Sequence, residues 1–212
     1  MTTAKLRGLP PGRAGRMWLG RRLAVAERGA GLLEQKLRIL VAEEQSFALL
    51  AERTQGEWEA AVGDLERWML RAALLSGERG WRLACDGEHA QAEIEWRQTM
   101  GVRYPARSSC RLPVREPSDP APTNTALVHA VTAAERAVRA GVDQAVAVTA
   151  LIAVRAEIAS TRRQLRAVRD RWTPRLESAR RALTIVLDDQ EHDEGVRLRW
   201  AAAPARGGTV WR

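Results

Sequence analysis

The stretch LGRRLAVAERGAGLLEQKLRIL, residues 19–40, has an apolar side chain at every third or fourth position. The same alternation of three and four continues to Leu75, and only Glu44 and Thr54 interrupt it. A mean spacing of 3.5 residues is typical of a left-handed coiled coil. It predicts a helix over 13–77, about 95 Å long at 1.5 Å per residue. A helix of that length is stabilised mainly by packing, so we expect a second helix along it.

A second apolar stripe begins with Leu127, Val131, Ala134 and Val138 and runs through Trp172 with the same spacing, which predicts a helix over 124–195. The further step of four from Trp172 to Leu176 is a stutter, which unwinds a supercoil locally, and Pro174 is expected to bend the helix. We therefore predict a mainly α fold, a long antiparallel two-helix coiled-coil hairpin with both termini at one end. The predicted seam contains Leu19, Leu23, Leu33, Leu37, Leu40, Trp58, Leu65, Trp68, Ile158, Leu165, Trp172, Leu176 and Leu183.

The connector, residues 78–123, has a different pattern and is expected to hold a small β-hairpin in an otherwise irregular segment. Apolar residues alternate with polar ones from Ala90 to Trp96, which predicts a strand. Trp81 and Leu83 are expected in the opposing strand, with Asp86–Gly87 as the turn. We expect tails at residues 1–12 and 196–212, the latter without fixed structure.

Composition indicates a folded protein with an acidic partner. Of the 212 residues, 45% are hydrophobic and 28% charged, and the net charge is +8. All basic residues except Lys5 and Lys36 are arginines. Such a charge favours nucleic acid, a lipid surface or an acidic protein as partner.

The motifs of several function classes are missing from the sequence. It contains no G-x-x-x-x-G-K-[ST] loop for a nucleotide, and His89, His129 and His192 lack the spacing of metal ligands. Cys85 and Cys110 are expected to be reduced thiols, and a redox pair is the alternative because both fall in one short region. We expect no active site, no cofactor, no membrane span, and a cytosolic address because no signal segment is evident.

Basic residues concentrate in two segments that the hairpin would bring side by side. Residues 5–38 hold nine basic and two acidic side chains, and residues 155–181 hold nine basic and three acidic ones. One interpretation is a solvated coiled-coil face. The other is the end of a shaft, surrounded by an acidic or dipole-rich partner.

Several segments, in this order along residues 10–200, resemble the D subunit of the V-type and archaeal A-type rotary ATPases. They are Pro11–Arg16, Ala26–Gly29, Leu32–Arg38, Met100–Val102 with Pro105, Glu157–Arg163, Thr173–Glu177 and Leu187–Glu191. The resemblance implies a non-catalytic rotor subunit, the central stalk, whose coiled coil enters a ring of three catalytic (A-type) and three non-catalytic (B-type) subunits. It also implies binding to the small F subunit and to the adaptor of the membrane rotor.

The resemblance further implies a mechanical role at the cytoplasmic side of the cell membrane. The protein would couple ATP synthesis or hydrolysis in the ring to ion transport, expected to be proton transport. Weak contacts between the shaft and the ring are required, since strong ion pairs would hold the rotor in place. The arginines expected to make them are Arg13, Arg16, Arg21, Arg22, Arg162, Arg163 and Arg175.

Two alternatives remain open from the residues. A basic coiled coil could bind nucleic acid, with an affinity that falls steeply with salt. Against it, Trp58, Trp68 and Trp172 fall on the predicted seam rather than among the basic residues as a stacking array. The other alternative is an assembly adaptor of a different complex.

Overall fold

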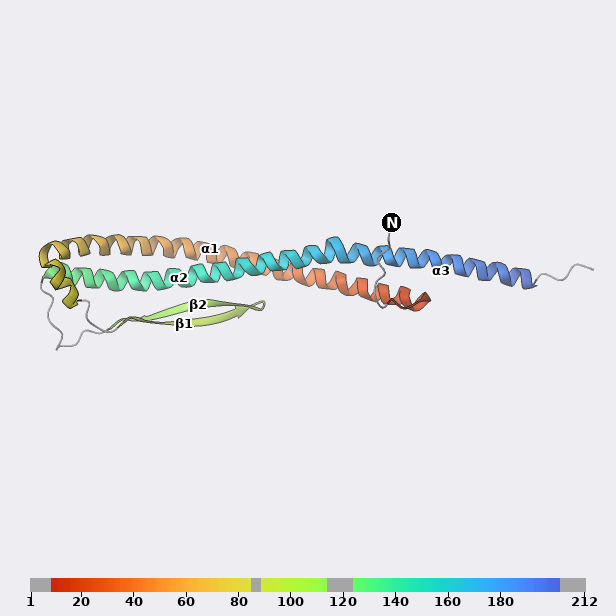
Figure 1. The fold of residues 1–212 in the computed structure, drawn as a ribbon, viewed down its shortest axis with the longest axis horizontal. Helices are drawn as coiled ribbons and strands as arrows, with labels where there is room; N and C mark the ends of the chain where they lie inside the picture. The colour runs from red at the N-terminus through yellow and green to blue at the C-terminus, as the bar shows by residue number, and fades with distance from the viewer. Residues whose placement is uncertain (1–8, 85–88, 114–123, 203–212) are drawn as a thin grey trace, which may run out of the picture. The chain divides into compact units, whose positions relative to one another are not determined.

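The computed structural model describes residues 9–84, 89–113 and 124–202, with backbone only for 78–84 (Figure 1). Its elements are α1 (Gly12–Ala84), β1 (Gln91–Thr99), β2 (Val102–Arg111), α2 (Thr125–Arg166), the π-helix η1 (Ala167–Trp172) and α3 (Thr173–Ala202). The predicted fold class, long helices with a small antiparallel hairpin in mid-chain, is confirmed. The C-terminal segment differs from the prediction, because residues 196–202 continue α3.

The chain divides into two compact units. The central unit is residues 36–161, and the terminal unit combines residues 1–35 with residues 162–212. The helix α1 contributes to both. It also continues past the predicted end near Gly77, where a positive φ of 63° interrupts the helix before it resumes to Ala84.

In the central unit, α1 and α2 pack antiparallel. Lys36 Nζ lies 2.5 Å from Glu157 Oε1, whereas Asn124, at the other end of α2, donates a hydrogen bond to Ser76. Asn124 also caps α2, because its Oδ1 accepts from the Leu127 N–H at 2.9 Å.

The first half of α2 uses a different face from the predicted one. Alanines line the side of α2 that is buried, whereas Val131 and Val138 are 42% and 41% exposed. Small side chains let two helices approach closely. The buried alanines at 126, 130, 133 and 137 each lie one residue before a predicted position, whereas Leu127 is buried as predicted. The buried set in this half is Ala126, Leu127, Ala130, Ala133 and Ala137.

This packing predicts that volume added at Ala133 destabilises the protein. Ala133 is fully buried, so Ala133→Leu overfills the seam and should lower the free energy of unfolding by about 1–3 kcal/mol. Val131→Leu adds one methylene at an exposed position and should change it by less than about 0.5 kcal/mol. Urea unfolding of both variants measures the difference. Equal losses would contradict the alanine seam.

The buried hydroxyl of Thr161 yields a second stability prediction. Thr161 is fully buried, and among the described residues its Oγ1 has no hydrogen-bond partner. Burying an unsatisfied polar atom costs free energy. Thr161→Val removes that atom at nearly constant shape and should raise the free energy of unfolding by about 1 kcal/mol. A lower melting temperature for Thr161→Val would mean that the hydroxyl is bonded in solution.

The β-hairpin lies further along the chain than predicted. β1 and β2 pair antiparallel around a turn at Met100 and Gly101, whose φ values of 50° and 83° suit a two-residue hairpin turn. Trp81 and Leu83 belong to α1, so the opposing strand predicted there is wrong, and the predicted turn at 86–87 lies outside the described residues. The sequence pattern of that segment was too short to separate strand from helix.

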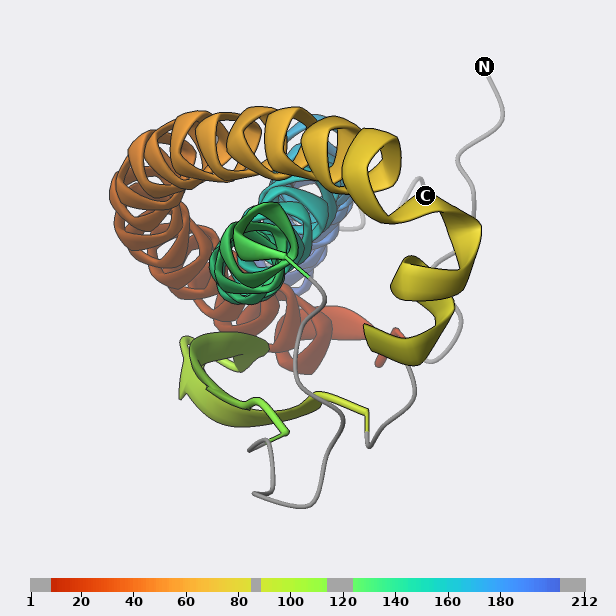
Figure 2. The same cartoon turned by 90° about the vertical axis from the view of Figure 1, so that its left-hand side faces the viewer.

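Within the central unit the hairpin lies beside the helices (Figures 1 and 2), and β2 packs against them. Val102 and Tyr104 join a buried cluster with Leu40 and Val154. The Tyr104 ring meets the Phe47 ring edge-on, with centroids 5.0 Å apart. Side chains of β1 are exposed over nearly its whole length. The hairpin therefore covers one side of the helix pair.

The sequence predicts no membrane span, but one helical stretch is unusually apolar. Within Thr125–Ala202, an 18-residue window has a mean hydropathy of 1.5, so by length and composition alone it could cross a membrane. In the central unit α2 packs against α1 on one side and contacts the hairpin. These contacts account for part of its apolar surface, since 28% of the window is buried.

Candidate functional site

The seven arginines predicted to contact a ring all lie in the terminal unit. Arg13, Arg16, Arg21 and Arg22 belong to α1, Arg162 and Arg163 to the C-terminal part of α2, and Arg175 to α3. Arg13 pairs with Glu191 at 2.8 Å, and Arg169 pairs with Glu34. These pairs show that the two helical arms of this unit run antiparallel.

A compact apolar core holds the two arms together. Leu19, Leu23 and Leu176 are buried in it. Gly15 is a close-packed position, because a Cβ there would collide with the Pro10 carbonyl oxygen. The packed arms give the arginines a fixed frame. Around the core lie Leu9, Trp18, Ala26, Ala179 and Leu183.

The predicted seam residues differ in burial across the two units. Leu19, Leu23, Leu40, Ile158 and Leu176 are buried. Leu33, Leu37, Leu65, Trp68, Leu165 and Leu183 are half-buried. Trp58 sits at the edge of the seam beside Gly141, and Trp172 is 56% exposed.

The exposure of Trp172 has its cause in η1. This segment is a π-helix, and the Thr173 N–H donates to the Val168 carbonyl, five residues back. The wider turn of the π-helix accommodates the additional step of four residues from Trp172 to Leu176. It lies just before Pro174, which has no N–H to donate. The assignment of Trp172 to the seam is therefore wrong, although the predicted stutter has a structural counterpart.

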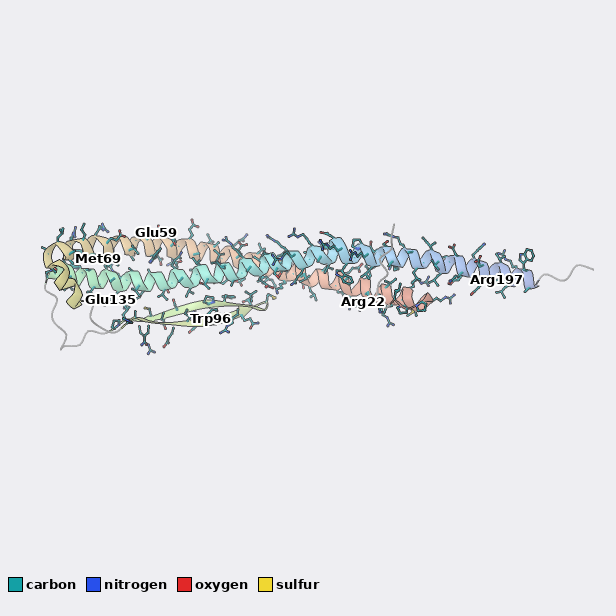
Figure 3. The ribbon with its side chains drawn as sticks, in the orientation of Figure 1. Arg22, Glu59, Met69, Trp96, Glu135 and Arg197 are labelled. Atoms are coloured by element: carbon teal, nitrogen blue, oxygen red, sulfur yellow. The ribbon has the colours of Figure 1, made fainter. Side chains whose placement is uncertain are left out.

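All seven arginines are exposed. Five of them, Arg16, Arg21, Arg162, Arg163 and Arg175, have no ion-pair partner among the described residues. The Arg22 guanidinium lies 5.0 Å from the centre of the Trp18 ring, and Figure 3 labels Arg22 among the side chains that project from α1. The arginine–aromatic contact holds this cation near its helix.

Two features of this surface were missed from the sequence. The spacing of four between Trp18 and Arg22 could have indicated their contact, since such pairs are neighbours on a helix. The pair of Arg169 with Glu34 could not be found in this way, because it depends on the register between the two arms.

Charge is unevenly distributed along the terminal unit. Residues 162–181 hold eight arginines against Asp170 and Glu177, whereas residues 188–194 hold five acidic side chains and no lysine or arginine. The exposed pair of Arg13 with Glu191 connects the acidic segment to the start of α1. The basic stretch therefore offers a row of cations to an anionic or dipole-rich surface.

The described side chains offer charge rather than reactive chemistry. Across residues 9–84, 89–113 and 124–202, no group of three or more His, Cys, Asp or Glu could hold a metal ion. Cys110 is a free, half-buried thiol of the central unit, and Cys85 lies outside the described residues. Glu57 raises the pKa of exposed Arg53 through a hydrogen bond and its charge. The arrangement suits reversible electrostatic contact.

Comparisons with known proteins give matches over most of the chain. The family of the ATP synthase D subunit matches residues 17–203. The D subunit of the A-type ATP synthase from Methanopyrus kandleri is 30% identical over 206 residues, which cover 94% of this chain and 88% of that protein.

Proposed function

Because the chain belongs to the family of ATP synthase D subunits, we propose that it is the central stalk of a rotary ATP synthase or V-type ATPase. The terminal unit would enter the ring of catalytic and non-catalytic subunits. Turning there, it would couple ATP synthesis or hydrolysis to ion transport, which we expect to be of protons. The chain itself would be a non-catalytic component of a membrane-associated complex.

The arginine-rich surface of the terminal unit carries this proposal. Its exposed guanidinium groups can attract acidic side chains or backbone carbonyls of a ring, and exposed pairs are individually weak. Weak contacts can form and break as the stalk turns. A stalk that contacts three catalytic sites unequally can shift their nucleotide affinities, because only differential contact moves a conformational equilibrium.

The remaining partners follow from the family. We propose that the chain binds the small F subunit and the adaptor of the membrane rotor, and that it lies at the cytoplasmic side of the cell membrane. It would need no cofactor, because nucleotides would bind in the ring.

Reconstitution tests the proposal. The catalytic and non-catalytic subunits, the F subunit and the membrane rotor are purified with and without this chain, and ATP hydrolysis and proton pumping are measured. We expect pumping only when the chain is present. Pumping that is equal without it would overturn the proposal.

The same preparation addresses the nucleic-acid alternative. Trp172 is exposed, neighbours Arg171 and lies near Arg175. Its position therefore no longer counts against nucleic-acid binding. Binding to DNA or RNA with a steep salt dependence, in place of binding to the ring, would favour it.

A further inference from the structure

Two of the sequence segments that carry the family resemblance meet in the terminal unit. One is Pro11–Arg16 at the start of α1, and the other is Leu187–Glu191 on α3. The ion pair between Arg13 Nη2 and Glu191 Oε1, at 2.8 Å, joins them across 178 residues of sequence. The two segments therefore form one contact between the arms.

The chain just before α1 folds back over this part of the unit. Leu9 packs against the buried core of Leu19, Leu23 and Leu176. Gly12, where α1 begins, has a φ of 69°, in the left-handed region that glycine adopts without strain. Residues 9–11 therefore lie against the packed arms and turn into α1 at this glycine.

Gly15 is the point at which residues 9–11, α1 and α3 come together. A Cβ at Gly15 would collide with the Pro10 carbonyl oxygen and would lie 3.0 Å from Leu183 Cδ2 of α3. At Gly20, further along the same helix, a Cβ would meet nothing within 4 Å. Glycine weakens a helix relative to alanine. Close packing gives a reason for the glycine at position 15 and none for the one at position 20.

We propose that residues 9–15 form a latch that ties the start of α1 to α3, with Gly15 as the seat of residues 9–11 and Arg13 as the ionic link to Glu191. Arg13 is then a positioning residue of the stalk rather than a contact to the ring. The latch keeps the two arms at one spacing while a ring presses on them unequally. That consequence rests on the proposed function, whereas the latch itself rests on contacts within the terminal unit.

Gly15→Ala and Gly20→Ala make the same change at the seat and at an open position, and hydrogen exchange of the α3 amides 183–191 in the full chain compares them. We expect Gly15→Ala to speed this exchange at least about tenfold, because a backbone carbonyl and a packed leucine must shift. Gly20→Ala is the matched control and should leave the exchange unchanged or slow it, since alanine favours the helix. Equal exchange in the two variants would overturn the latch.

Arg13→Ala and Glu191→Ala test the ionic link without adding volume. Each should speed the same exchange about two- to fivefold, as suits an exposed pair, and the double variant should exchange no faster than the single ones. Additive effects would mean that the two side chains act separately and would overturn the link.

The reconstituted complex distinguishes a latch from a ring contact at Arg13. If Arg13 acts through Glu191, Arg13→Ala and Glu191→Ala lower proton pumping equally, and the double variant lowers it no further. Reduced pumping with Arg13→Ala alone would assign this arginine to the ring and overturn its positioning role. Absence of pumping with the unmodified chain would instead count against the proposed function and would leave the exchange results in force.

Discussion

Reversing Arg16, Arg162, Arg163 and Arg175 to glutamate in one chain is expected to reduce ATP-driven proton pumping of the reconstituted complex by about tenfold or more. Each exposed contact is worth about 0.2–1 kcal/mol, so four lost contacts and their repulsion exceed the 1.36 kcal/mol that corresponds to a factor of ten. All four side chains are exposed in the terminal unit, so the fold should tolerate the change. Pumping and hydrolysis are measured on the same vesicles.

The control reverses four exposed arginines of the central unit that form no ion pair with the described residues: Arg38, Arg71, Arg97 and Arg136. It changes the net charge of the chain by the same amount. It therefore separates an effect of the arginines of the terminal unit from an effect of net charge. We expect the control complex to pump close to the unmodified rate. Equal loss in both complexes, or normal pumping with the first set, would rule out a role for the arginines of the terminal unit in coupling.

The predicted seam on α1 shows how much of the fold the sequence contains. Leu19, Leu40 and Ala72 are buried at the spacing that the sequence displays, because a sustained repeat leaves one face of a helix apolar. On α2 both sides are apolar, so the same rule could not choose between two stripes. Hydrophobicity favoured Val131 and Val138, whereas close packing selected the alanines beside them.

The candidate surface was predictable as a set of residues but not as a set of contacts. The arginine clusters are visible in the sequence, and the helices place all seven selected arginines in one unit. The exposure of Trp172 was not predictable, because it depends on the π-helix that precedes Pro174. The hairpin turn at Met100 and Gly101 was missed in favour of Asp86–Gly87, since both pairs suit a tight turn and only the strand pairing distinguishes them.

Leu19→Ala should lower the free energy of unfolding of the isolated chain by about 2–5 kcal/mol, because it removes three carbons from a fully buried position. Leu19 packs with Leu23 and Leu176, which join the two arms of the terminal unit. The neighbours are held on separate helical arms, so collapse around the cavity is limited. Urea unfolding followed by circular dichroism measures the loss.

Leu32→Ala makes the same chemical change at a side chain that is 67% exposed on α1 and should cost less than about 0.5 kcal/mol. The contrast between the two leucines tests whether the arms share a packed seam, since a solitary helix would respond alike to both changes. In the reconstituted complex the Leu19→Ala chain should also couple poorly, because arginines on loosened arms no longer meet the ring in fixed positions. Equal stability of the two variants would remove the rigid frame on which mechanical coupling depends.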